Sequence, residues 1–238
     1  MFKKLKFEIY PNSPLVEVIF EIRFLGEPVI ECRRDVFFDL IRTDYSNLLV
    51  PQTKKGGFIA LEPYRFEKRD RSAGIMLPVN RFSYYCRKYS GFVAFKKEVL
   101  KLIRKFKQAY PKINTLSRIG FRYVNIIPFT REDNVVPLDR FLNIRFQMPI
   151  TITGKYSNIS LGFIAKTNKG SITTRIETLK ATDQSGEAIL LDLDYAKEEG
   201  LSMKNINKYL DESHNYSRQI FEDLITDSYR MFLRGETI

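Results

Sequence analysis

The sequence has few of the residues that build metal centres, disulfide frameworks and catalytic triads. It contains one histidine, two cysteines and no tryptophan in 238 residues. A single histidine with no nucleophile at a known spacing does not support a triad. Cys32 and Cys86 lie far apart and match neither a metal-binding nor a redox spacing. We therefore predict two free thiols, no catalytic residue, no metal and no cofactor.

Signals for membrane insertion, secretion and phosphate binding are also missing. No apolar run approaches the roughly 18 residues that a membrane-spanning helix needs. The opening residues, MFKKLKFEIYPNSP, are too polar and alternating for a secretory signal peptide. There is no glycine-rich phosphate loop and no Gly-x-Ser-x-Gly motif. Together with the free thiols, these absences predict a cytoplasmic protein that does not enter a membrane, and they favour a non-enzymatic function.

Positive charge is what the sequence has in excess, and it is unevenly distributed. The net charge is +11. Residues 1–112 carry 23 basic residues (Lys and Arg) against 12 acidic ones (Asp and Glu), whereas residues 113–238 carry 16 basic and 16 acidic residues. Within the first part, residues 54–112 hold 16 basic and 4 acidic residues, a net charge of +12. Such a concentration of positive charge indicates an acidic or polyanionic partner.

Two long strands are predicted from the alternation of side chains. Residues 14–24 (PLVEVIFEIRF) place apolar residues on one face and Glu17, Glu21 and Arg23 on the other. Residues 116–129 (LSRIGFRYVNIIPF) are largely apolar on both faces, so we expect both faces of this strand to be covered.

Helices and hairpins account for most of the remaining chain. Helices are predicted at 35–50, at 90–110 with Ser90 as N-cap, and at 202–233 with Ser202 as N-cap. Further strands are predicted at 58–66, at 75–89 with Pro78 at an edge or bulge, in a hairpin over 150–181, and at 188–195.

These elements predict an α+β fold with a mainly antiparallel sheet. The order strand, helix, hairpin, helix occurs once in the basic half, residues 1–112, and once in the neutral half, residues 113–238. This repetition suggests two duplicated units. No linker or low-complexity segment separates the halves, so we expect one compact body that ends in a long C-terminal helix.

The predicted strand 116–129 carries polar side chains where unpaired polar atoms are costly. We expect Arg122 to be paired with a carboxylate or a ligand rather than exposed on the surface. Candidate partners are Glu17, Glu21 and Glu177. The complete set of candidate ligand-binding or structural polar residues is Glu17, Glu21, Arg118, Arg122, Asn125, Arg175, Glu177 and His214.

His214 could act as a general base, and one pair of aspartates could bind a metal ion. His214 lies on or beside the apolar stripe of the closing helix, which favours a buried structural role over a general base. Asp192 and Asp194 share one face of a strand and could hold a hard cation. An ordinary solvated strand end is the preferred interpretation of this pair.

The basic segment provides the candidate nucleic-acid contacts. In the helix at 90–110, like charges recur four residues apart, which destabilises a helix unless they are screened. Tyr64, Phe66, Tyr84 and Tyr85 are interleaved with cations, as in surfaces that stack bases. No motif of a known nucleic-acid-binding module is present. The candidate residues are Lys54, Lys55, Arg69, Arg71, Lys97, Lys101, Arg104, Lys105 and Lys107.

Three segments together carry a family resemblance. YPNSPLVEVIFEIRF, LSRIGFRYVN and LDESHNYSRQIFEDLITDSYRMF resemble a sporadically distributed bacterial and archaeal family of uncharacterised proteins. The resemblance implies a setting among mobile or antiphage-defence genes but no activity. The positions that match the family pattern are Arg122, Tyr123, Asn125, His214, Phe221 and Thr226.

Three functional hypotheses follow. The leading one is a non-enzymatic module that binds a polyanion, nucleic acid in particular, through residues 54–107. The second is an enzyme or sensor that holds a small anionic, phosphorylated ligand near Arg122. The third is an accessory or chaperone-like protein that binds a neighbouring toxin or effector. The sequence carries no signal for an oligomeric state.

Overall fold

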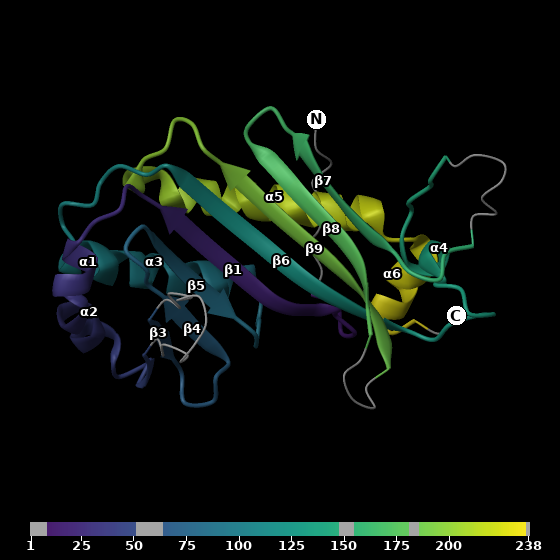
Figure 1. The fold of residues 1–238 in the computed structure, drawn as a ribbon, viewed down its shortest axis with the longest axis horizontal. Helices are drawn as coiled ribbons and strands as arrows, with labels where there is room; N and C mark the ends of the chain where they lie inside the picture. Colours follow the sequence, from purple (N-terminus) through teal and green to yellow (C-terminus); the bar gives the residue numbers. More distant parts are fainter. Residues whose placement is uncertain (1–8, 51–63, 148–154, 181–185, 237–238) are drawn as a thin grey trace, which may run out of the picture.

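In the part of the chain that the structure describes, a nine-stranded antiparallel sheet forms the body of the protein (Figure 1). The structure is a computed structural model that describes residues 9–50, 64–147, 155–180 and 186–236. The strand order is β2-β3-β4-β5-β1-β6-β9-β8-β7. The predicted α+β class with an antiparallel sheet is confirmed. Residues 1–112 and 113–238 both contribute strands to this sheet, and they meet where β1 pairs with β6.

The described residues of the first half form five strands and three helices. They are β1 (Leu15–Arg23), α1 (Val29–Cys32), α2 (Arg34–Ile41), β2 (Asn47–Leu49), β3 (Arg65–Glu67), β4 (Ala73–Met76), β5 (Arg81–Cys86) and α3 (Phe92–Ala109). The second half begins with the longest strand and ends with two helices. It contains β6 (Arg118–Phe129), α4 (Leu138–Phe141), β7 (Ser160–Lys166), β8 (Ser171–Leu179), β9 (Glu187–Lys197), a 3-10 turn (Met203–Asn205), α5 (Ile206–Leu224) and α6 (Asp227–Arg234).

Several predicted boundaries are wrong for identifiable reasons. The strand predicted at 75–89 is two strands, because Pro78 lies in the turn between β4 and β5. The helix predicted at 35–50 ends at Ile41, and Asn47–Leu49 pairs with β3 instead. Gly91, and not Ser90, is the N-cap of α3, with a φ of 112° that glycine adopts readily.

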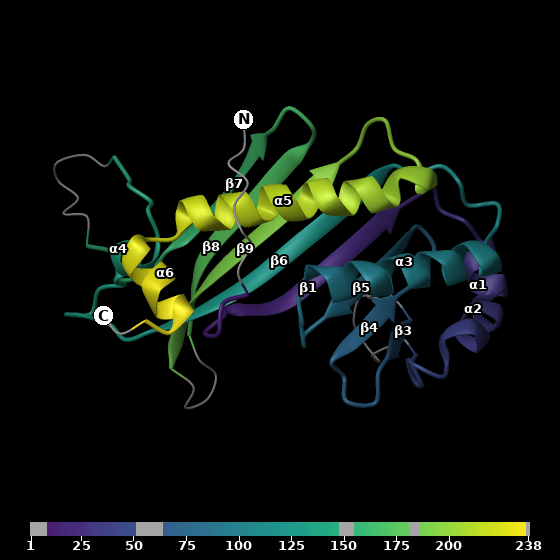
Figure 2. The same cartoon turned by 180° about the vertical axis from the view of Figure 1, so that it is seen from behind.

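The helices α3 and α5 cover one face of the sheet (Figure 2). The alternation of β1 and β6 directs Val18, Phe20 and Phe121 toward these helices, where all three are buried. One core lies under α2, α3 and the first turns of α5, and a second lies under the rest of α5 and α6. Among the described residues, no helix is both long enough and apolar enough to cross a bilayer.

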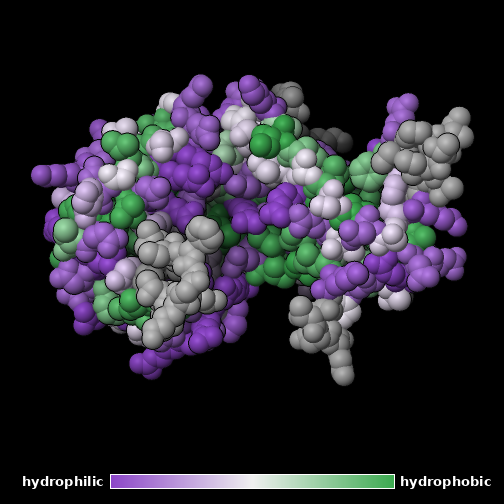
Figure 3. All heavy atoms as spheres, in the orientation of Figure 1, coloured by the Kyte–Doolittle hydropathy of each residue, from purple (hydrophilic) through white to green (hydrophobic). Residues whose placement is uncertain are grey.

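The opposite face of the sheet is not covered by any helix of the described part of the chain (Figure 1). It faces the viewer in Figure 3, where hydrophilic side chains gather over its middle. The expectation that both faces of the strand at 116–129 are covered is therefore wrong. Arg118 and Arg122, which alternate with the core residues, lie on this open face and are only partly buried.

The closing helix is interrupted after Leu224. Ile225 is extended and forms a bridge with Leu142, and α6 begins two residues later. The Thr226 hydroxyl accepts a hydrogen bond from the Tyr229 amide at 3.1 Å and donates one to the Arg140 carbonyl at 2.6 Å. Thr226 is thus the N-cap of α6, and it ties α6 to α4. The hydrophobic periodicity continues through this position, so the sequence predicted one uninterrupted helix.

Replacing Thr226 with alanine tests this cap. Thr226→Ala removes both hydrogen bonds and should lower the free energy of unfolding by about 1–2 kcal/mol. Thr226→Ser retains the hydroxyl and should stay within about 0.5 kcal/mol of the wild type. Urea unfolding followed by circular dichroism measures both. Equal losses in the two variants would contradict the capping role.

Candidate basic surface

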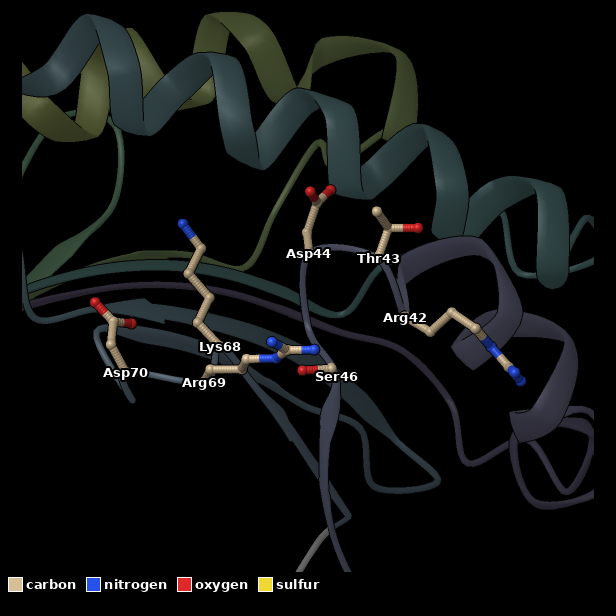
Figure 4. Close-up of a pocket in the computed structure, with 7 residues that line it drawn as sticks. All are labelled: Arg42, Thr43, Asp44, Ser46, Lys68, Arg69 and Asp70. Atoms are coloured by element: carbon tan, nitrogen blue, oxygen red, sulfur yellow. The ribbon is translucent and has the colours of Figure 1, made fainter.

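Cations from three separate segments meet at one end of the sheet. Figure 4 shows an open pocket formed by the segment after α2 and the β3–β4 turn, with α3 beside it. The lining residues are Arg42, Thr43, Asp44, Ser46, Lys68, Arg69 and Asp70. In Figure 4 the carboxylate of Asp44 points toward α3, and Arg69 extends toward Ser46. Sequence reasoning found the turn and the helix but missed the segment 42–46, which it placed inside a helix.

Asp44 organises the lysines on this edge of α3. Lys101 donates to its carboxylate at 2.7 Å, and the Lys105 ammonium lies 3.9 Å away. The hydrogen bond from Lys101 is the main cause that lowers the pKa of Asp44, and it raises the pKa of Lys101 in turn. The repulsion predicted between these lysines is therefore partly screened within the protein.

Other predicted contacts remain open to solvent. Arg69, Arg71, Lys97, Arg104 and Lys107 are exposed, and no carboxylate among the described residues pairs with them. Lys97, Lys101 and Arg104 lie on one stripe of α3 because they are spaced by four and three residues. We call the described set Lys68, Arg69, Arg71, Lys97, Lys101, Arg104, Lys105 and Lys107 the α3 basic surface. Lys54 and Lys55 lie outside the described residues.

The predicted stacking aromatics are not available to bases. Phe66, Tyr84 and Tyr85 are buried. Tyr64 is partly buried, with the Arg34 guanidinium 3.3 Å above its ring centroid. Phe66 and Tyr84 belong to the core, and Tyr85, on the opposite face of β5, donates its hydroxyl to Glu67. Whatever binds the α3 basic surface would therefore be held by charge and not by base stacking on these rings.

A second cluster of charges lies on the open face of the sheet and is internally paired. Arg122 donates two hydrogen bonds to Asp192, each 2.7 Å long. Arg118 bridges Glu21 at 3.1 Å and Asp194 at 2.8 Å. Ser83 donates to the second Glu21 oxygen at 3.0 Å. This ion-pair network links β5, β1, β6 and β9 across the centre of the sheet.

The candidate partners of Arg122 were wrong. Glu17 pairs with Arg87 at 3.0 Å, Glu21 pairs with Arg118, and Glu177 pairs with Arg175 on its own strand at 2.8 Å. The partner is Asp192, which is buried, so the preferred interpretation of this residue as part of a solvated strand end is wrong. The sequence placed Asp192 and Asp194 on one face correctly, but the register that brings β9 beside β6 depends on contacts about 70 residues apart.

The pKa values in this network are shifted by its ion pairs and by burial. Hydrogen bonding to Asp192 raises the pKa of Arg122, and burial raises the pKa of Asp194 against the opposing effect of Arg118. Asn125, on the covered face, donates to the Leu191 carbonyl at 3.0 Å and ties β6 to β9. Within the described ranges, no group of three or more His, Cys, Asp or Glu side chains is arranged to hold a metal ion.

His214 faces inward, as its position on the stripe predicts. Its ring stacks on Phe92 with a centroid separation of 3.9 Å, and Nδ1 lies 2.7 Å from the Tyr123 hydroxyl. That hydroxyl lies 3.2 Å from the hydroxyl of Tyr89. Asp211 and Glu212 bind Lys96 and Lys169 instead. The histidine thus joins α5 to α3 and β6; its lack of a catalytic role stays a prediction.

Comparison with known proteins adds no functional assignment. No family model matches the chain, and no curated protein matches it.

Breaking the Arg122–Asp192 pair should destabilise the fold. Arg122→Met leaves the carboxylate of Asp192, a residue that is 3% exposed, without its ion-pair partner. Leaving a fully buried charge unpaired lowers the free energy of unfolding by about 3–5 kcal/mol. Because Arg122 is itself partly exposed, we expect a smaller loss of about 2–3 kcal/mol. The double variant Arg122→Met/Asp192→Leu should recover most of the loss. Urea denaturation measures this, and a double variant no more stable than the single one would contradict the pairing.

The buried histidine should make stability depend on pH. Burial is the main cause that lowers the pKa of His214 to about 4, from about 6.5 in an unfolded chain. Since the unfolded state takes up the proton first, the stability that His214 contributes is complete above pH 6.5. It is lost as the pH falls toward about 4.

Comparing wild type with His214→Gln isolates this contribution. Between about pH 7.5 and about pH 5, the free energy of unfolding of the wild type should fall by about 2 kcal/mol more than that of the variant. Carboxylates contribute equally to both proteins and cancel in the difference. Identical pH profiles would show that His214 is not buried in its neutral form.

Proposed function

We propose that this protein is a non-enzymatic module that binds a polyanion, nucleic acid in particular, through the α3 basic surface. The observation that carries the proposal is the convergence of cations from the β3–β4 turn and α3 around Asp44. Asp44 holds Lys101 and Lys105 in place, which lowers the entropy lost when they meet a phosphate. Lys97, Arg104 and Lys107 are exposed and pair with no carboxylate of the described residues, so they can contact successive phosphates.

The manner of binding follows from which groups are exposed. With the nearby aromatic rings buried, affinity would come from phosphate contacts and the release of counterions. Binding should therefore depend steeply on salt and weakly on base sequence. The cytoplasmic location predicted from the sequence is part of this proposal, as is the defence-related setting that the family resemblance implies.

A small anionic ligand near Arg122 has less support. Arg122, Arg118 and Arg175 each contact a carboxylate, so a ligand would have to displace Asp192, Asp194 or Glu177. The accessory or chaperone-like function depends on the family resemblance alone.

We also propose that the two halves arose by duplication. Read outward from the centre of the sheet, the order β1-β5-β4-β3 in the first half matches β6-β9-β8-β7 in the second, and β2, beyond β3, has no counterpart among the described strands. Each half also has a helical segment after its first strand and a long helix, α3 or α5, after its last strand. The halves differ in charge, so only the first would have acquired the polyanion-binding function.

Charge reversal at exposed positions tests the function. Lys97→Glu/Arg104→Glu/Lys107→Glu leaves the pairs of Asp44 intact. A matched control, Arg145→Glu/Lys155→Glu/Lys204→Glu, changes the net charge equally at exposed sites outside the α3 basic surface. Binding to labelled single-stranded DNA, duplex DNA and RNA is measured by fluorescence anisotropy over a range of salt concentrations.

The first variant should lose most of its affinity at low salt, and the slope of log K against log salt should fall by about 0.7–0.9 for each lost phosphate contact. The control should keep the wild-type slope. If no nucleic acid binds the wild type at low salt, or if both variants lose affinity equally, the proposal is wrong.

A further inference from the structure

The two edges of the sheet are unequal. The edge strand β2 has three residues, a length that limits pairing with another chain. The other edge, β7, has seven residues, SLGFIAK, with one charge at its end and no proline. Phe163 is 43% exposed and Ile164 is 72% exposed, although they lie on opposite faces of the strand. Figure 3 shows hydrophobic surface along this edge.

The backbone of β7 presents unpaired groups in a regular pattern. Thr178 donates to the Ile159 carbonyl and Thr167 donates to the Gly170 carbonyl, so odd-numbered residues pair with β8. In an antiparallel ladder the residues between them direct N–H and C=O away from the partner strand. Ser160, Gly162, Ile164 and Lys166 therefore point their backbone groups outward, and no strand of the described chain lies beyond them.

We propose that this edge pairs with the β7 edge of a second copy of the chain, antiparallel and centred on Phe163. In this register Ile164 lies opposite Gly162 of the second copy, so a large side chain meets the one residue without a side chain. Lys166 lies opposite Ser160, so the single charge meets no like charge. All seven residues take part, and the contact is related to itself by a two-fold axis, as a closed dimer requires.

Proline substitution separates pairing from folding. Ile164→Pro removes an outward N–H that takes no part in the ladder with β8, and proline is tolerated at such edge positions. Each dimer would lose two hydrogen bonds, which should weaken dimerisation about tenfold or more. Ile164→Thr keeps the backbone N–H and places a residue suited to a strand, so it should weaken dimerisation less than Ile164→Pro. Analytical ultracentrifugation over a range of concentrations measures the dissociation constant, and thermal melts confirm that the variants fold.

Cysteine cross-linking tests the register. In a Cys32→Ser/Cys86→Ser background, Phe163→Cys would face its own copy across a non-hydrogen-bonded pair, with Cα atoms about 4.5 Å apart. That separation permits a disulfide. In the same background, Ala165→Cys would lie about 13 Å from its counterpart, four residues along the strand, and should not cross-link.

A concentration-dependent dimer that Ile164→Pro weakens and that Phe163→Cys traps supports the proposal. A wild-type monomer at every concentration overturns it. So does a dimer that Ile164→Pro leaves unchanged, because the contact would then lie elsewhere. Dimerisation that appears only after residues 1–8 are removed also overturns it, because the chain's own N-terminal segment would then cover the edge.

Discussion

The pairing of β6 with β1 on one side and β9 on the other is the interaction on which the rest of the structure depends. β6 has eleven partners in β9, and its pairing with β1 joins the two halves. Its covered face supplies Phe121 and Tyr123 to the core, and its open face supplies Arg118 and Arg122 to the ion-pair network. One strand thus anchors both the apolar and the charged contacts that hold the halves together, so a shift of one residue would misplace both sets.

Local patterns in the sequence predict much of this arrangement. Alternation of apolar and charged residues predicts β1, and a stretch that is apolar on both faces predicts β6. The hairpin predicted over 150–181 contains β7 and β8, and the apolar stripe of α5 predicts the inward position of His214. What the sequence did not predict depends on tertiary contacts. The partner of Arg122 required the register of β9, and the interruption at Ile225 required the contact with Leu142. The burial of Phe66 and Tyr84 depends on which sheet face the helices cover, and Tyr85, on the opposite face, is buried where its hydroxyl donates to Glu67.

The two charged clusters differ in how far their charges are satisfied. On the open face of the sheet, guanidinium groups and carboxylates are matched nearly one to one, which favours a fixed geometry. Around α3, Asp44 neutralises only part of the charge of Lys101 and Lys105. Lys97, Arg104 and Lys107 pair with no carboxylate of the described residues. Of these two clusters, only the second therefore retains a charge excess that an external polyanion would relieve.

The position of the α3 basic surface also bears on assembly. It lies in the half that contains β2 to β5, whereas β7 is the last strand at the opposite edge of the sheet. Pairing through β7 would extend the sheet and leave one basic surface toward each outer end, without burying either. A dimer of this kind would contact one polyanion at two separated places, and the second contact would form at a high effective concentration when the polyanion is long enough to span both. A nucleic acid long enough to reach both surfaces should then bind more tightly than a short one. The gain in affinity should exceed what the phosphates under one surface contribute, and a monomer would not show this extra gain.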